Sequence, residues 1–347
     1  MEIQVIIRNL SPIFSAAPGA ARINLDGSMA VTGQGLPCTR ARTLSVVAPQ
    51  LDGSIKPVAL PVVPNNTMRN LLRRTMLNEI IEPTLAGTTK LDIGAYAAAY
   101  SGNASGNPDG TPSTLDEIVE MRSHPFIGLF GGGPRMLEGR LMIDGLYPLH
   151  INAIRVIGEG FEDRLISGKI TDIIWARRVD PITKLLDEED AALIKGGTTA
   201  VNDWITKLAD ATKAKAAQRK KKDDDSQPED EGADSNARGL NAFNAHEVVI
   251  PGVSWLWRIN ADSPTQAQVG MILQALAKMP KYQIAGGHAK GYGAFEIEDI
   301  TLDGESIWFA GQLNSDKASP YLDALTEALD GMTGDAFERF AKSSKEA

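Results

Sequence analysis

Two segments with helical periodicity, far apart in the chain, are the feature that most restricts the fold of this 347-residue protein. In residues 67–82, apolar side chains recur at the three- and four-residue spacing of a single helix face. They are Met68, Leu71, Leu72, Met76, Ile80 and Ile81. Asn65 or Asn66 is placed to cap this helix. Pro83 is expected to stop it, because proline lacks the N–H that the next turn requires.

The second helical segment covers residues 264–279. Its start has the pattern of a capping box, with Ser263 as the cap, Pro264 at the first position and Gln266 at the third. The predicted buried stripe consists of Val269, Ile272, Leu273 and Leu276. Each of the two helices therefore has one face to bury against a sheet.

Strand-like runs flank both helices. Ile3, Val5 and Ile7 fall on one side of an extended chain with Gln4 and Arg8 interspersed, and residues 21–31 contain the turn signal Asp26-Gly27. Further β-prone runs lie at 43–47, 58–63, 137–143 and 246–259, and another follows residue 293. The order strand, helix, strand, interruption, strand, helix, strand predicts an α+β protein with a ferredoxin-like β-α-β-β-α-β core. Two amphipathic helices are expected after it, near residues 319–329 and 335–342.

The interruption has a different composition. Its sequence KAKAAQRKKKDDDSQPEDEGAD places a basic block directly before an acidic block. Such a run has too little apolar surface to order itself, so residues 213–238 are predicted to be a flexible loop tip.

Composition restricts the possible partners. The net charge of −9 argues against binding nucleic acid unless the cations gather at one place. Cys38 is the only cysteine, which excludes a disulfide framework or a cysteine-based metal site within one chain. No apolar run reaches membrane-spanning length and the start does not resemble a signal peptide. A cytoplasmic protein with no membrane contact, no metal and no cofactor is expected.

The segment IAGGHAKGYGAF, residues 284–295, is the most suggestive motif. Glycines let a phosphate chain approach backbone N–H groups, and Lys290 adds a cation. The candidate contacts are Gly286, Gly287, His288, Lys290 and Gly291. A tight turn without a ligand explains the same glycines. His288 could act as a general acid or base, but a lone histidine is more often a hydrogen-bonding loop residue.

Three further segments carry candidate phosphate contacts. In VPNNTMRNLLRR, the first-turn N–H groups at Asn66 and Thr67 and the pair Arg69 and Arg73 can face a phosphate. The loop FGGGPR presents Arg135, and the segment around Trp175 presents basic side chains beside an aromatic ring. The basic residues of that segment are Lys169, Arg177 and Arg178. A solvated helix face and ordinary turns are the simpler explanations.

Together these motifs resemble the backbone subunits of the RAMP superfamily of CRISPR proteins. Three segments carry the resemblance, in the family's order: VPNNTMRNLLRR, HPFIGLFGGGPRMLEGRLMIDG and the glycine-rich IAGGHAKGYGAFEIE. The match spans about residues 20–300. The low lysine content of the chain and its divergent first motif are most similar to those of plasmid-associated type IV systems.

The resemblance implies a modified RNA-recognition-motif palm with an inserted β-hairpin thumb. The palm would comprise residues 1–164 and 251–311, the thumb 165–250, and a C-terminal helical segment 312–347. Copies of the chain would stack head to tail along a guide RNA, beside other CRISPR effector subunits, and present the guide to a complementary target nucleic acid. RNA-cleaving relatives carry an aspartate before the first helix. The matching stretch LPCTRARTLSVVAP has no acid, which predicts a protein that does not cleave and is not an enzyme.

Two alternatives remain at this point. One is a metal-independent RAMP endoribonuclease that processes guide RNA with His288 or His124. The other is a scaffold protein that binds no nucleic acid, which the acidic composition favours.

Overall fold

The structure is a computed structural model that describes most of the chain and forms two compact units. The residues outside the description are 20, 25, 31–34, 50–52, 87–89, 103–113, 134–136, 180–193, 205, 208, 209, 211–240 and 342–347, together with the side chains of 176–179 and 241–244. The first unit comprises Met1–Pro18, Arg40–Asp172 and Glu247–Ala347, and the second comprises Gly19–Thr39 and Ile173–His246. The second unit thus includes residues 19–39, which lie outside the segment 165–250 that was predicted to be inserted. The charged segment 213–238 lies outside the described residues.

An antiparallel sheet forms the centre of the first unit. Its strands follow the order β14-β13-β1-β12-β8, and β9 also pairs with β12. The bounds are β1 Glu2–Asn9, β8 Leu141–Ile143, β9 Tyr147–Pro148, β12 Ser254–Ala261, β13 Phe295–Leu302 and β14 Glu305–Ser306. The alternation predicted for β1 is confirmed, because Ile3, Val5 and Ile7 are fully buried on one face of the sheet.

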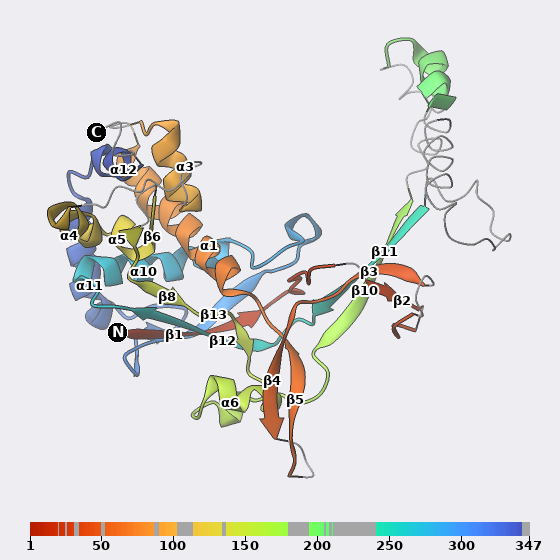
Figure 1. Ribbon diagram of the computed structural model, residues 1–347, viewed down its shortest axis with the longest axis horizontal. Helices are drawn as coiled ribbons and strands as arrows, with labels where there is room; N and C mark the ends of the chain where they lie inside the picture. Colours follow the sequence, from red (N-terminus) through yellow and green to blue (C-terminus); the bar gives the residue numbers. More distant parts are fainter. Residues whose placement is uncertain are drawn as a thin grey trace. The chain divides into compact units, whose positions relative to one another are not determined.

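Helices cover that face of the sheet, and a hairpin covers the other (Figure 1). The main core joins the β1 side chains to the predicted stripes of α1 (Asn65–Met76) and α10 (Gln266–Lys278). On the opposite face, Ile6 and Leu256 pack against the β4–β5 hairpin and α6. These elements span Thr43–Pro49, Ile55–Pro61 and Ile154–Ile157. Along the chain, the central elements run β1, α1, β8, β12, α10, β13, so the predicted order of strands and helices is present.

The first helix differs from the prediction at both ends. It begins at Asn65 after Pro64, without a side-chain cap, and it does not stop at Pro83. A π-helical turn, η1 Leu77–Ile81, leads instead into α2, Glu82–Leu85. Proline at position 83 cannot bond to the carbonyl of Glu79, and that oxygen accepts from Lys278 Nζ at 3.2 Å. A partner from another helix therefore offsets the lost hydrogen bond, which is one part of the penalty on which the predicted stop rested.

The second helix has its capping box two residues later than predicted. Thr265 accepts from Gln268 N, and the Gln268 side chain accepts from Thr265 N. Ser263 instead adopts a positive φ of 44°. The predicted stripe Val269, Ile272, Leu273 and Leu276 is fully or almost fully buried.

Within the described residues, five further helices belong to the first unit. They are α3 Ile93–Ser101, α4 Leu115–Ser123, α5 Ile127–Phe130, α11 Ser315–Leu329 and α12 Asp335–Ala341. The last two confirm the expected C-terminal helices, although α11 begins earlier because Asn314 caps it. In the part of the chain that is described, no helix has the length and apolar character needed to cross a bilayer.

A four-stranded sheet in the order β10-β11-β3-β2 organises the second unit. Its strands span Thr171–Val179, Asn241–Val249, Leu36–Thr39 and Ala21–Ile23. β2 and β3 run antiparallel, whereas β3 and β11 are parallel. A small buried cluster of Ile23, Cys38 and Ala245 holds these strands together.

Candidate nucleic-acid interface

The glycine-rich loop joins η4 (Met279–Lys281) to β13, and three glycines give it its shape. Gly287, Gly291 and Gly293 have φ values of 81°, 76° and 86°, the region that side chains other than glycine rarely adopt. Between the first two, His288–Lys290 form one turn of 3-10 helix, η5. His288, Lys290 and Gly291 are exposed, so this turn is the part of the loop that can meet a ligand.

The glycines of the loop have different roles. A Cβ at Gly287 would lie 2.6 Å from Tyr292 Cδ2, and one at Gly293 would lie 2.1 Å from the Ile284 carbonyl oxygen. These two positions need glycine for the loop itself. A Cβ at Gly291 would have no atom within 4 Å, so the space there is open to a ligand.

The loop is fastened to the segment that follows β1. Gly286 N donates to Phe14 O and Gly293 N donates to Pro12 O, both at 2.9 Å. Ala294 N donates to Ser11 Oγ at 2.8 Å. The position of the loop is therefore determined by residues 11–14.

Asn9, at the end of β1, fastens that segment in turn. Its Oδ1 accepts from Val253 N and from Trp255 Nε1, both at 3.1 Å. Its Nδ2 donates to Ser11 O at 2.8 Å and to Ile250 O at 2.9 Å. Asn9 was not among the predicted site residues. A signal existed, because Asn9 continues the buried alternation of Ile3, Val5 and Ile7 as a polar residue.

A second candidate surface lies at the start of α1. Asn65, Asn66 and Arg69 line a hollow of about 400 Å³ together with β8 and Asp144. An adjacent hollow of about 290 Å³ shares Asn65 and Asp144 and adds Arg42. Arg42 is exposed and was missed from the sequence.

The two arginines of α1 occupy different environments. Arg69 is half-buried, and its guanidinium donates to Leu141 O at 3.2 Å and to Phe130 O at 2.6 Å. Arg73 is only 4% exposed, with its Cζ 4.6 Å from the centre of the Phe130 ring. Burial and the neighbouring Arg69 lower the pKa of Arg73 to about 10, and burial also lowers the pKa of Arg69.

This geometry favours a structural role for Arg73 over the predicted phosphate contact. A Cβ at Gly102, the residue that ends α3, would lie 2.1 Å from Arg73 Nη1. The guanidinium is therefore packed between the end of α3 and a ring, and it does not reach the surface where Arg69 and Asn66 lie. Arg69 keeps its place among the candidate contacts.

The remaining predicted contacts are dispersed. Thr67 is half-buried within the first turn of α1. Lys169 is exposed, and the residue after it, Ile170, accepts from Ile250 N at 3.0 Å through its carbonyl. Arg135 lies outside the described residues. Arg177 and Arg178 belong to β10, and their side chains are likewise outside the description.

His124, named in the nuclease alternative, is half-buried. Its Nδ1 accepts from the N–H groups of Phe126 at 3.2 Å and Ile127 at 3.1 Å, and Phe337 contacts the imidazole edge-on. Its Nε2 is buried and has no hydrogen-bond partner among the described residues. Burial lowers the pKa of His124 from 6.5 to about 4. A histidine held neutral in this way is a poor proton donor for a substrate at the surface.

The lowered pKa of His124 predicts a loss of stability in acid. Below pH 6.5, His124 binds a proton in the unfolded chain but not in the folded chain. The free energy of unfolding therefore falls as the pH falls from about 6.5 to 4. The expected loss is about 3 kcal/mol. His124→Asn keeps an acceptor for the two N–H groups but cannot titrate. Urea unfolding at pH 7 and pH 4.5 should show a smaller acid loss for the variant than for the wild type. Equal losses of stability in the two proteins would contradict the lowered pKa of His124.

Comparisons with known proteins found a similar fold but no similar sequence. No protein-family model matches the chain, and no curated protein matches its sequence. Among solved structures, a chain from a structure titled "Type IV-B CRISPR Complex" is similar, with a TM-score of 0.51 and 14% sequence identity. The similarity covers 90% of this chain and 96% of the other. The two chains therefore share a fold over nearly their whole lengths.

Proposed function

We propose that this chain is a backbone subunit of a CRISPR ribonucleoprotein effector, of the RAMP superfamily and of type IV. It binds guide RNA through the phosphate backbone, repeats along that RNA, and presents it for pairing with a target. The observation that carries the proposal is the shared fold with a chain of a type IV-B CRISPR complex over 90% of this protein. The resemblance of the three sequence motifs to the RAMP backbone subunits supports it independently.

The strand order supports a ferredoxin-like palm. Four strands in the order β13-β1-β12-β8, with all three pairings antiparallel, correspond to the order 4-1-3-2 along the chain. Each crossover helix, α1 or α10, joins two strands that are separated by a third, which is the split βαβ arrangement. We assign the second unit, with β10 and β11, to the thumb.

The glycine loop and the start of α1 are the RNA-binding surfaces in this proposal. The exposed turn at His288–Lys290 and the open space at Gly291 suit the close approach of a phosphate chain. Arg42 and Arg69 supply cations beside Asn65 and Asn66. Such contacts bind any sequence, and base pairing with the guide then selects the target.

The absence of cleavage is part of the proposal. The stretch of residues 36–49 contains no acid, and the carboxylate that lies beside it comes from Glu247 of β11. That carboxylate accepts from Arg40 Nε at 2.6 Å and from Ala41 N at 3.1 Å, and Glu247 is 7% exposed. A buried carboxylate that already holds two donors is unsuited to activating a nucleophile.

The decisive experiment is purification from cells that carry a type IV guide locus. A guide-bound assembly has a high ratio of absorbance at 260 nm to that at 280 nm and a mass of several copies. A protein free of nucleic acid, at the mass of one chain, would support the scaffold alternative. Shortening of a repeat-containing RNA in the absence of metal would support the nuclease alternative.

Arg69→Gln should weaken RNA binding about equally for all sequences. Removing one phosphate interaction per copy should make the salt dependence of the affinity shallower by about one unit. Glutamine retains a donor for one of the two backbone carbonyls, so the fold should persist. Arg74→Gln is the matched control, because Arg74 is exposed on the same helix but lies outside the hollow. Fluorescence anisotropy with a single-stranded RNA at several salt concentrations measures the slope. Identical slopes for both variants would remove Arg69 from the interface.

A further inference from the structure

The β4–β5 hairpin has an apolar face that none of the described residues of its own unit covers. Its register pairs Ser45 with Ala59, Val47 with Pro57, and Pro49 with Ile55. All six side chains are exposed, and none is charged. The other face of the hairpin packs into the protein through residues such as Val46 and Leu60. The uncovered face has no cation to attract a phosphate, so it is better suited to contact protein than RNA.

The strand edges of this hairpin are protected. Pro49, Pro57 and Pro61 lie within its two strands, and proline cannot donate a hydrogen bond to an added strand. A partner is therefore expected to contact the face of the hairpin and not to extend its sheet.

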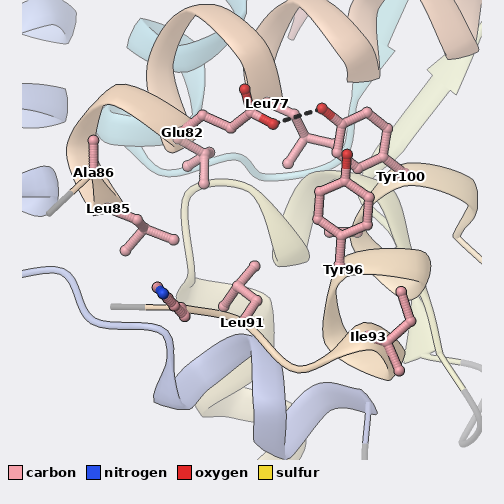
Figure 2. A pocket seen from close by; sticks show the side chains of 11 residues that line it. Leu77, Glu82, Leu85, Ala86, Leu91, Ile93, Tyr96 and Tyr100 are labelled. Carbon is pink, nitrogen blue, oxygen red and sulfur yellow. Dashed lines mark hydrogen bonds between the residues drawn. The ribbon is translucent and has the colours of Figure 1, made fainter. Parts of the chain in front are cut away.

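A second uncovered apolar surface lies between η1, α2 and α3. It is a hollow of about 460 Å³ whose lining includes Leu77, Leu85, Leu91, Ile93 and Tyr96. Figure 2 shows these side chains gathered around the hollow from several segments of the chain. Ile93 is 82% exposed and Tyr96 is 44% exposed.

Two polar side chains that line the hollow, Tyr100 and Glu82, are paired with each other. Tyr100 OH donates to the Glu82 carboxylate at 2.7 Å and lies 2.6 Å from Asn78 Oδ1. The tilted rings of Tyr96 and Tyr100, with centroids 4.4 Å apart, form one wall. Lys90 also lines the hollow but is exposed, so its ammonium group can stay in water when an apolar occupant binds.

The two apolar surfaces lie at opposite ends of the first unit, with α3 at one end and the β4–β5 hairpin at the other (Figure 1). One copy cannot bring them together, but two copies in the same orientation can. We propose that the β4–β5 hairpin of one copy docks into the α3 hollow of the next. The contact is heterologous, so each copy that docks leaves one of the two surfaces free for the next copy. This inference rests on the proposed function, and it adds the pair of surfaces through which neighbouring copies meet.

The size of the hairpin predicts a weak contact. Seven residues per strand extend about 24 Å, and two strands are about 10 Å wide, so the face offers on the order of 240 Å². A stable interface buries about 800 Å² on each partner. The contact alone should therefore assemble the protein only at high concentration. Copies held side by side on one RNA gain effective concentration and should assemble readily.

Sedimentation velocity of the RNA-free full chain tests the contact by itself. The wild type should show an average mass that rises with concentration. Val47→Asp, on the hairpin, and Ile93→Asp, in the hollow, should each weaken this association by about tenfold or more. Ile93 begins α3, where an acidic residue is compatible with the helix, so the variant should fold. Phe309→Asp is the control, because Phe309 is 72% exposed and belongs to neither surface.

Mixing the two variants is the stringent arm of the experiment. The Val47→Asp protein keeps its hollow and the Ile93→Asp protein keeps its hairpin, so an equal mixture should form pairs but nothing larger. A mixture that stays monomeric, or a Val47→Asp protein that assembles like the wild type, would overturn the pairing of these two surfaces. Because RNA is absent, these results are independent of whether the chain binds RNA. RNA binding is measured separately, and its failure would count against the proposed function.

Discussion

Replacing Asn9 with leucine should lower the free energy of unfolding by about 4 kcal/mol. The residue is fully buried, and its side chain makes four hydrogen bonds. Leucine has nearly the same shape, so little volume changes. The variant leaves the Val253 N–H, the Trp255 indole N–H and the Ile250 carbonyl without that partner. Each buried group left unsatisfied costs about 1–3 kcal/mol. Urea denaturation followed by tryptophan fluorescence measures the loss.

Asn70→Leu provides the control for the Asn9 variant. Asn70 is exposed on α1, and leucine is a better helix former, so the change should stay within about 0.5 kcal/mol. If Asn9→Leu proves as stable as this control, the network does not hold the end of β1. If the network does hold the end of β1, Asn9→Leu should also displace the glycine loop. Asn9 positions residues 11–14, and those residues position the loop.

Local patterns predicted the elements of the fold. The alternation of Ile3, Val5 and Ile7 and the stripes of α1 and α10 are encoded within a few residues each, so the strand and both helices could be found from the sequence. The end of the first helix could not. Past Pro83, the unbonded carbonyl of Glu79 is satisfied by Lys278, a residue of a different helix. A signal that depends on a distant partner is absent from the local sequence.

The candidate site was predictable in its glycines but not in its arginines. Arg69 and Arg73 are one turn apart, which predicts one shared face. The structure buries Arg73 because Phe130 and Gly102 reach it from segments that are distant in sequence. The glycine spacing did indicate a loop of unusual backbone. It could not show which glycines leave no room for a side chain within the loop and which one faces open space. That difference depends on the positions of Tyr292 and Ile284.

Gly291→Val should reduce guide RNA affinity by about thirtyfold for each hydrogen bond to phosphate that the new side chain prevents, while the palm stays folded. The side chain enters space that is open in the free protein and that a phosphate would occupy in the complex. A hydrogen bond to a charged group contributes about 2 kcal/mol, which corresponds to that factor. Gly287 is unsuitable for this test, because a side chain there would meet Tyr292 and deform the loop itself. Lys290→Ala should have a smaller effect, because an exposed charge is screened by solvent, and His288→Ala should have the smallest.

Gly304→Val separates the effect on RNA from the effect of backbone strain. Gly304 has a φ of 86°, against 76° for Gly291, and a Cβ there also has no atom within 4 Å. Valine at either position forces an unfavourable backbone conformation that costs about 1–2 kcal/mol, so the two variants should be destabilised alike. Gly304 lies in the turn between β13 and β14, away from the glycine loop, so its variant should bind RNA as the wild type does. Anisotropy titrations with one single-stranded RNA, with circular dichroism to check the fold, compare the pair. Equal RNA affinities for the two variants would mean that the loop is a turn without a ligand, and RNA binding would then depend on the start of α1 and the second unit.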